Sequence, residues 1–258
     1  MTPTLPTLSA IVITRNEAHN LDDCLQSLKG LVNEIIVVDS QSTDDTVAIA
    51  MRHGAHVSQP ADWPGFGPQK NRALNLATCD WVLSIDADER VTPELADEIR
   101  TVLQERPQGV AFQIPRLSWY CGRFIQHAGW QPDHVLRLFA RDSARFTDDL
   151  VHERLLTTHT IRSLKAQLLH YSFLNFSQVL DKVDRYSTAS ALQMQQRGKK
   201  SSVSKAVGHG LWAFFRTYFL RCAFLDGAQG FALAVSNAEG TYYRYMKLWL
   251  LTREENSK

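Results

Sequence analysis

Short apolar runs alternate with helical patterns along the first half of the chain. The runs predict strands at 8–13, 35–38, 55–58 and 81–85. The segments that follow them predict helices at 17–29, 46–52, 68–77 and 93–106. In the first of these helices, Ala18, Leu21, Leu25 and Leu28 share one face, as in an amphipathic helix. Strands and helices are therefore expected to alternate in this region.

The predicted strands are almost continuously apolar, which indicates burial on both faces. Such strands alternating with helices are typical of an α/β fold, with a mostly parallel sheet and helices on both faces. In open sheets of this kind, ligands bind at the carboxyl ends of the strands. Thr14, Asp39 and Asp86 stand at those ends, so the sequence predicts the functional site there.

The pattern changes from residue 109 onward. Strands are predicted at 109–114 and 134–139, and the loop between them is aromatic and contains glycine. Residues 176–197 and roughly 203–251 have amphipathic helical patterns, separated by a polar linker at 198–202. We expect an α/β domain over residues 1–175, divided into segments 1–106 and 107–175, and a helical extension over 176–258.

Composition excludes several classes of protein. With 44% hydrophobic and 21% charged residues, the chain is neither disordered nor fibrous. Its 4 cysteines form no C-x-x-C pattern, which fits free thiols in a reducing cytoplasm. No apolar stretch of about 18 residues predicts a membrane span, and the N-terminus lacks a signal-peptide pattern. A cytoplasmic location is therefore expected.

The net charge of +1 is unevenly distributed. Residues 1–150 hold 13 basic and 20 acidic side chains, a net charge of −7, whereas residues 151–258 hold 15 and 7, a net charge of +8. A basic C-terminal region predicts an anionic neighbour, with phospholipid, a phosphorylated acceptor and nucleic acid as alternatives. No recognised nucleic-acid motif is present, so we expect no nucleic-acid partner.

The clearest candidate for chemistry is Asp86-Ala87-Asp88, at the end of an apolar strand. Two carboxylates one residue apart leave a strand on the same side and can face one hard cation. Oxygen ligands of this kind suit Mg²⁺ or Mn²⁺, which in turn bridges a substrate diphosphate. The alternative is an acidic surface turn, but the position at a strand end favours the metal site.

Two further polar segments follow predicted strands. Asp39 ends the second strand, where a carboxylate can accept hydrogen bonds from a ribose or a base edge. Thr14, Asn16 and Glu17 lie between the first strand and its helix and are candidates for the same nucleotide pocket. The alternative for both segments is helix capping, which is the expected role of Ser42 and its neighbours.

A glycine-containing segment, GFGPQKNR at 65–72, precedes a predicted helix that carries Lys70 and Arg72 near its start. Two cations and a helix dipole suit an anionic diphosphate. The segment is neither a P-loop nor a dinucleotide fingerprint. A solvated basic helix start is the alternative.

Taken in order, LSAIVITRNEAHNL, EIIVVDSQSTDDT, QKNRAL and WVLSIDADE resemble the family 2 inverting glycosyltransferases of GT-A fold. The resemblance covers roughly residues 8–100. It implies that Thr14, Asn16, Glu17 and Asp39 hold the nucleotide, within the segment 1–106. It also implies that Asp86 and Asp88 bind the divalent metal and the diphosphate of a UDP-sugar donor.

The middle of the chain is similar to a bacterial subgroup, the lipopolysaccharide core β-1,4-glucosyltransferases. Its hallmarks here are G-W-x-P-D at 129–133, R-L-F at 137–139, V-H-E at 151–153 and, more weakly, D-G-x-x-G-F at 226–231. The resemblance implies transfer of a hexose, glucose from UDP-glucose, to a lipid-linked core heptose. Polyprenyl-phosphate, exopolysaccharide or peptide acceptors remain alternatives, as does a non-catalytic sugar-nucleotide-binding protein.

An inverting transfer needs a carboxylate to take the proton of the acceptor hydroxyl. The family often places an E-D pair before the acceptor site, whereas this chain has His152-Glu153. Glu153 is the first candidate for the base and Asp133 the second. His152 is either a metal ligand, a diphosphate contact or a packed histidine.

The C-terminal region contains aromatic residues interleaved with Arg216 and Arg221, between Trp212 and Phe224. This pattern resembles a helix at an anionic membrane surface. Helices packed on the α/β core are the alternative. We expect a peripheral protein on the cytoplasmic face of the inner membrane.

Overall fold

The computed structural model describes residues 6–148 and 153–255. Its first strands are β1 (Leu8–Thr14), β2 (Glu34–Asp39), β3 (His56–Ser58) and β4 (Trp81–Ser84). These strands pair in parallel in the order β3-β2-β1-β4. Helices α1 (Ala18–Ser27), α2 (Thr46–Arg52) and α3 (Phe66–Leu76) connect them, and α4 (Pro93–Gln104) follows. The predicted elements of this region are present, with boundaries shifted by at most a few residues.

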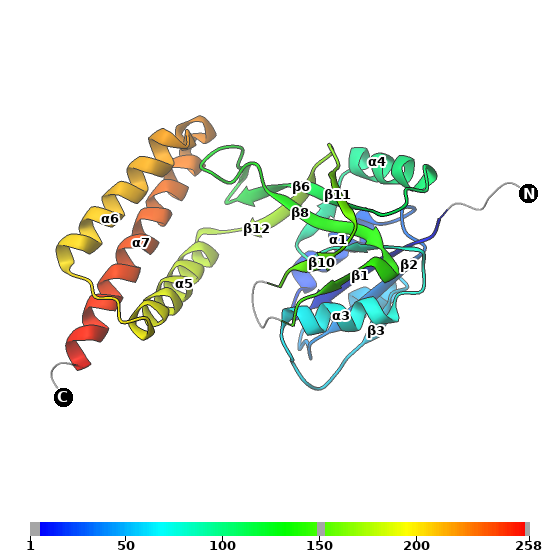
Figure 1. Cartoon of the computed structure of the whole chain (residues 1–258), viewed down its shortest axis with the longest axis horizontal. Helices are drawn as coiled ribbons and strands as arrows, with labels where there is room; N and C mark the ends of the chain where they lie inside the picture. Colours follow the sequence, from blue (N-terminus) through cyan, green and yellow to red (C-terminus); the bar gives the residue numbers. More distant parts are fainter. Residues whose placement is uncertain (1–5, 149–152, 256–258) are drawn as a thin grey trace, which may run out of the picture. The chain divides into compact units, whose positions relative to one another are not determined.

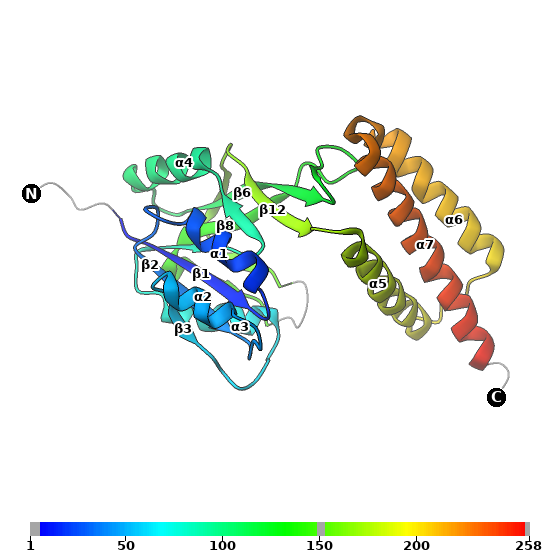
Figure 2. The ribbon, with the colours of Figure 1, turned by 180° about the vertical axis from the view of Figure 1, so that it is seen from behind.

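The alternation of side chains along β1 divides the core between the two faces of the sheet. Leu8 and Val12 pack in one buried cluster with residues of α1, α2 and α4. Ile11 points the other way and packs with Leu74 of α3. Opposite views show α3 on one face and α1 and α2 on the other (Figures 1 and 2). Because β1 runs parallel to both β2 and β4, the loops that follow these three strands lie at one edge of the sheet.

Beyond β4 the sheet is mixed, so the mostly parallel expectation holds only for its first half. Strand β8 (His134–Ala140) pairs antiparallel with β4, and β6 (Val110–Tyr120) pairs antiparallel with β8. Strand β12 (Leu168–Phe173) lies next in order and pairs antiparallel with β5 (Glu89–Val91). The connection explains the antiparallel pairing of β6 with β8, because a loop without a helix joins them, whereas parallel neighbours need a long crossover.

The remaining short elements lie around this half of the sheet. They are β7 (Arg123–Phe124), β9 (Ala144–Phe146), β10 (Leu155–Thr157), β11 (Thr160–Ser163) and a 3₁₀ turn (Arg141–Ser143). Strands β7 and β11 pair with β6, and β9 and β10 form a separate two-stranded sheet.

The chain divides into two compact units. The first contains residues up to Arg116 together with Asp133–His170. The second contains Leu117–Pro132 together with residues from Tyr171 onward. The helical unit thus includes the aromatic loop between β6 and β8 in addition to the predicted helices.

The helical unit contains α5 (Phe176–Gln196), α6 (Val203–Phe215) and α7 (Gly227–Glu255). The first two begin at capping residues, because Asn175 Oδ1 accepts from Gln178 N at 3.0 Å and Ser202 Oγ accepts from Lys205 N at 3.2 Å. The polar segment at 198–202 connects α5 to α6, as expected.

The helical pattern at 203–251 forms two helices, α6 and α7. A π-helical turn (Arg216–Leu220) and a 3₁₀ turn (Ala223–Asp226) reverse the chain between them. Cys222 adopts a left-handed conformation, with φ of 54°. The buried carboxylate of Asp226 fixes the reversal, since it accepts from His127 N at 2.8 Å and Gln126 N at 3.2 Å. This contact gives the aspartate of the D-G-x-x-G-F motif a structural role.

Candidate active site

The carboxyl ends of β1 and β2 meet at Thr14 and Asp39, which are register partners. Asp39 is fully buried, and it accepts hydrogen bonds from Thr14 Oγ1 at 2.9 Å, Ser42 N at 2.9 Å and Gln59 Nε2 at 3.2 Å. These donors fix the orientation of the carboxylate at the sheet edge.

The loop after β1 is tied to the loop after β2 through Asn16. Its Oδ1 accepts from Thr43 N at 2.8 Å, and its own N–H donates to Ser42 Oγ at 2.7 Å. Asn16 has a φ of 56°, a left-handed conformation that asparagine tolerates better than most residues. Capping side chains of the second loop therefore also hold the first loop, which agrees with the capping interpretation of these segments.

Glu17 connects this corner to the D-x-D motif. Burial raises the pKa of Glu17. A hydrogen bond from Asn20 lowers this pKa, and the negative charge of Asp88 raises it. The Asp88 carboxylate itself lies 3.2 Å from His170 Nε2. The first loop and the motif are thus electrostatically coupled.

Asp86 is held by two cations. Lys70 Nζ lies 3.0 Å from Asp86 Oδ1, and Arg137 Nη2 donates to Asp86 Oδ2. Burial alone would raise the pKa of Asp86, but Arg137 and Lys70 outweigh it and hold the pKa well below its usual range. The ionised form therefore stabilises the fold at any pH above the ordinary carboxyl pKa, and this contribution is lost only as the pH falls through the lowered value.

Lys70 also contacts Glu153, which therefore lies close to Asp86. Its ammonium lies 2.7 Å from Glu153 Oε1, so one buried lysine contacts the carboxylates of both Asp86 and Glu153. Helix α3 approaches closely enough for this because of Gly67, where a Cβ would lie 1.7 Å from the Thr147 carbonyl oxygen and 3.3 Å from Glu153 Cβ. The glycine is therefore required by packing.

Three charged residues that the sequence did not assign to the site hold its carboxylates in place: Glu89, Arg116 and Arg137. Glu89 has no exposed surface, and its carboxylate accepts from Asp86 N at 2.9 Å, Arg137 Nη2 at 2.7 Å and Arg116 Nη1 at 3.3 Å. Arg116 Nε also donates to Asp133 Oδ2 at 2.9 Å. The R-L-F motif contained Arg137, but nothing in the sequence indicated its partners, which lie far away along the chain.

The other predicted residues take different positions. Asp133 is connected to Asp86 indirectly, because Arg116 contacts both Asp133 and Glu89, and Glu89 contacts Asp86 N and Arg137. Arg72 does not join the acidic cluster but donates to Asp62 Oδ2 at 2.7 Å. Ala87 is buried, and its carbonyl oxygen accepts a hydrogen bond from Arg90 Nη1 at 2.9 Å. His152 lies outside the described residues.

The donor set suits a hard divalent cation that shares its coordination with a substrate. Neither Asp86 nor Asp88 is fully buried, and Asp86 would share with the ion the oxygens that now contact Lys70 and Arg137. Within residues 6–148 and 153–255, no group of three His, Cys, Asp or Glu side chains surrounds a metal position. Mg²⁺ is commonly bound by one or two carboxylates plus phosphate oxygens, so the two aspartates fit such an ion together with a diphosphate.

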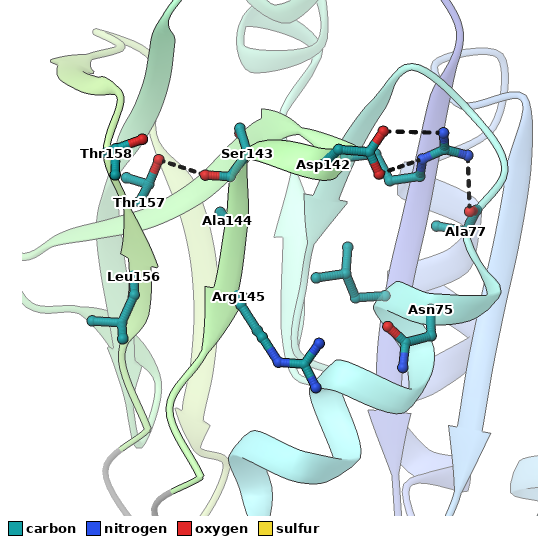
Figure 3. A pocket seen from close by; sticks show the side chains of 11 residues that line it. Asn75, Ala77, Asp142, Ser143, Ala144, Arg145, Leu156, Thr157 and Thr158 are labelled. Carbon is teal, nitrogen blue, oxygen red and sulfur yellow. Dashed lines mark hydrogen bonds and ion pairs between the residues drawn. The ribbon is translucent and has the colours of Figure 1, made fainter.

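A pocket of about 670 Å³ lies elsewhere in the first unit. It is lined by residues that follow α3 and β8, including Ala77 and Arg141, near the amino end of β4 (Figure 3). Arg141 is engaged by Asp142 at 3.3 Å and by the Ala77 carbonyl at 3.5 Å. Because this pocket lies at the amino end of the parallel strands, it is not the candidate site.

The chain belongs to a family of sugar-transferring enzymes. Residues 9–174 match the family described as Glycosyl transferase family 2. Family membership and the mixed α/β sheet confirm the expected GT-A class and the resemblance seen in the sequence. The protein is therefore a glycosyltransferase.

Its relatives extend over nearly the whole chain. A protein from Rickettsia felis described as an uncharacterized glycosyltransferase is 34% identical, over 93% of this chain and 89% of that protein. The lipopolysaccharide core biosynthesis glycosyltransferase LpsC of Rhizobium meliloti is 30% identical, over 96% of this chain and 94% of that protein.

Among solved structures, glucosyl-3-phosphoglycerate synthase from Mycobacterium tuberculosis, in complex with Mn²⁺, UDP and glucosyl-3-phosphoglycerate, is similar at 28% identity. The match covers 44% of each chain with a TM-score of 0.37. TarS of S. aureus matches at 19% identity over 64% of this chain and 36% of that one, with a TM-score of 0.46.

Proposed function

We propose that this protein is a metal-dependent inverting hexosyltransferase, which moves glucose from UDP-glucose to a lipid-linked saccharide, namely a heptose of the lipopolysaccharide core. The observation that carries the proposal is the buried ammonium of Lys70, which contacts both Asp86 of the D-x-D motif and Glu153. It brings the proposed donor-binding carboxylate and the proposed base together. Similarity to LpsC, described as a core biosynthesis enzyme, supports the acceptor class.

The nucleotide is proposed to bind at the carboxyl ends of β1 and β2. Asp39 would accept hydrogen bonds from the ribose or the base, with Thr14 and Gln59 holding its carboxylate in place. Asn16 and Glu17 would line the same corner. Lys70 would face the diphosphate, whereas Arg72, held by Asp62, would contribute less than the sequence suggested.

Asp86 and Asp88 would hold Mg²⁺ or Mn²⁺, with His152 as a further candidate ligand. When bound, the ion offsets the negative charge that develops on the leaving diphosphate. Arg137 and Glu89 would keep Asp86 in position, because Arg137 contacts both carboxylates and Glu89 accepts from Asp86 N.

The transfer itself needs a proton acceptor beside the attacking hydroxyl. The acceptor oxygen would bond to the anomeric carbon on the face opposite the diphosphate, the bond to UDP would break, and Glu153 would take the hydroxyl proton. Glu153 is favoured over Asp133 because it shares Lys70 with Asp86, whereas Asp133 is paired with Arg116.

A donor and acceptor screen with the purified protein tests the proposal. UDP release and product mass are measured with UDP-glucose, other UDP-sugars and a heptose-terminated core lipid. We expect a single added hexose. Polyprenyl phosphate, exopolysaccharide or peptide serving as the better acceptor would overturn the acceptor assignment. UDP binding without turnover on any acceptor would indicate a non-catalytic sugar-nucleotide-binding protein.

Metal removal and the D-x-D variants form the first prediction. EDTA, Asp86→Ala and Asp88→Ala should each remove most of the activity, by roughly tenfold or more, because the leaving diphosphate loses its counter-ion. Circular dichroism should show that the variants remain folded. Asp142→Ala removes an exposed carboxylate far from this edge and serves as the matched control. Unchanged turnover in EDTA, with both variants active, would contradict the metal site.

Loss of the Asp39 carboxylate should weaken UDP binding. We expect Asp39→Ala to cost about 1.5–3 kcal/mol of binding free energy, the range for a hydrogen bond to a charged group. Calorimetry with UDP measures the effect, with Asp44→Ala in the same turn as control. Equal UDP affinity of the two variants and the unchanged protein would remove Asp39 from the pocket.

An exposed apolar ridge on the helical unit supports a membrane-surface role. Its members on α6 and the following turns are 44–69% exposed and include residues spaced four apart: Val203, Val207, Leu211, Trp212, Phe215, Phe219 and Leu220. The opposite face of α6 packs on α7, where Gly210 lies so close that a Cβ would be 3.2 Å from Tyr242 Cβ. None of the helices in the described residues is long and apolar enough to span a membrane.

We expect binding to anionic vesicles that weakens at high salt. Each Lys or Arg near such a surface contributes about 1 kcal/mol, and salt screens the attraction. Reversing the charges of Lys199, Lys200 and Arg216 should reduce flotation with anionic vesicles, and Leu211→Ser should do so independently. Reversing the exposed Lys29 and Arg52 is the control. Equal recovery with neutral and anionic vesicles, or none with either, would contradict the surface role.

A further inference from the structure

The helical unit contains a pocket that the proposed reaction does not use. It has a volume of about 310 Å³, at the lower end of the range of ligand pockets, which suits a single sugar residue. It lies among α5, α7 and the ends of β6 and β12, and every lining residue belongs to the helical unit.

One wall of this pocket is a cluster of aromatic rings. The Tyr120 ring centroid lies 5.9 Å from that of Trp130 and 5.8 Å from that of Phe173. Tyr120 is fixed further by a hydrogen bond of 3.0 Å between its hydroxyl and Ser236 Oγ. Tyr120 has almost no exposed surface and holds the other two rings in place, so Trp130 and Phe173 are the rings that can pack against the C–H bonds of a sugar.

The other walls are polar and hydroxyl-rich. Helix α5 contributes Ser187 and Ser190, and α7 contributes Ser236, Asn237 and Thr241. Aromatic faces on one side and hydroxyl and amide groups on the other match the two kinds of surface that a saccharide presents. Ser187 and Ser236 are already engaged, by Lys247 Nζ at 2.9 Å and by the Tyr120 hydroxyl at 3.0 Å, so a saccharide would meet chiefly Ser190, Asn237 and Thr241.

The charged residues that line the pocket are both cationic. Lys182 lies 4.6 Å from the Phe173 ring centroid, and Arg244 enters from α7. Arg244 Nε is buried, and no group of the described residues hydrogen-bonds to it. The carboxylate of Asp184 on α5 is instead bound by Lys247 at 2.6 Å. The pocket therefore presents positive charge and an unused buried donor.

We propose that this pocket binds one acidic sugar residue, carrying a carboxylate or a phosphate, with its ring against Trp130 and Phe173 and its anionic group facing Lys182 and Arg244. The assignment of that residue to the acceptor saccharide rests on the proposed function. The binding site itself does not, because it stands on the aromatic wall, the hydroxyl groups and the two cations.

Binding of small probes to the full chain, without donor, tests the site. Saturation-transfer NMR and calorimetry are run with glucuronate and glucose 6-phosphate, against glucose and inorganic phosphate. We expect glucuronate and glucose 6-phosphate each to bind more tightly than glucose or inorganic phosphate. Arg244→Gln and Lys182→Gln should each weaken binding of the acidic sugars by roughly ten- to hundredfold. Lys205→Gln, on the exposed side of α6, is the matched control and should have no effect.

Three outcomes would overturn the site: no binding of any probe, equal binding of glucose and glucuronate, or inorganic phosphate binding as tightly as glucose 6-phosphate. UDP release is measured separately on the same variants. Unchanged UDP binding with a raised KM for the phosphorylated core lipid, and unchanged kcat, assigns the bound sugar to the acceptor. Probe binding in a protein that fails to transfer hexose would reject the proposed function and keep the site.

Discussion

Glu153→Gln is expected to lower kcat by roughly 10²–10⁴ while UDP-glucose binding stays intact. Glutamine preserves the shape of the side chain but cannot take the proton of the acceptor hydroxyl. The contact with Lys70 at 2.7 Å can persist through the amide oxygen, so the packing around Gly67 should not change. Steady-state kinetics with saturating donor and core lipid, together with calorimetry for UDP, measure the two effects separately.

Asp133→Asn is the comparison variant, because Asp133 is the second candidate for the base. Its carboxylate is paired with Arg116 at 2.9 Å, so its replacement should alter stability more than kcat. If Asp133→Asn shows the large loss of kcat while Glu153→Gln remains active, the two assignments are reversed.

Arg137→Ala is expected to destabilise the fold by about 3–5 kcal/mol, the cost of removing one partner from a buried ion pair. Glu89 has no exposed surface, and Arg137 is its nearest cation at 2.7 Å. Without Arg137 the buried carboxylate keeps only Arg116 at 3.3 Å, together with the Asp86 N–H. Urea unfolding of the two proteins, with equal m-values, measures the difference.

Arg141→Ala provides the control, because it removes a half-buried arginine whose ion-pair partner, Asp142, is exposed. Exposed pairs contribute about 0–1 kcal/mol, so this variant should unfold close to the unchanged protein. Similar unfolding midpoints for Arg137→Ala and Arg141→Ala would show that Arg137 does not hold the site together. The double variant Arg137→Met with Glu89→Leu should recover some of the lost stability, since no unpaired charge remains.

The local elements of the first unit could be predicted because short-range patterns specify them. Four apolar runs became β1 to β4, and the polar residues after them lie at the carboxyl ends of β1, β2 and β4. The periodicity of residues 203–251 was helical throughout, yet the chain reverses between Cys222 and Gly227, which has a φ of 66°. The reversal depends on Asp226 binding the backbone of residues 126 and 127, a contact between distant segments.

The sequence by itself determined the family, the α/β class and the identities of Asp39, Asp86, Asp88 and Glu153 as candidates, because each stands in a local motif with a fixed spacing. Only the tertiary structure decided which of the candidates meet. Lys70 joins Glu153 to Asp86, and the support from Arg137 and Glu89 joins residues about fifty positions apart. Such pairings depend on the register of the mixed sheet and on which buried charges lie close enough to form ion pairs. No local sequence pattern specifies either of these.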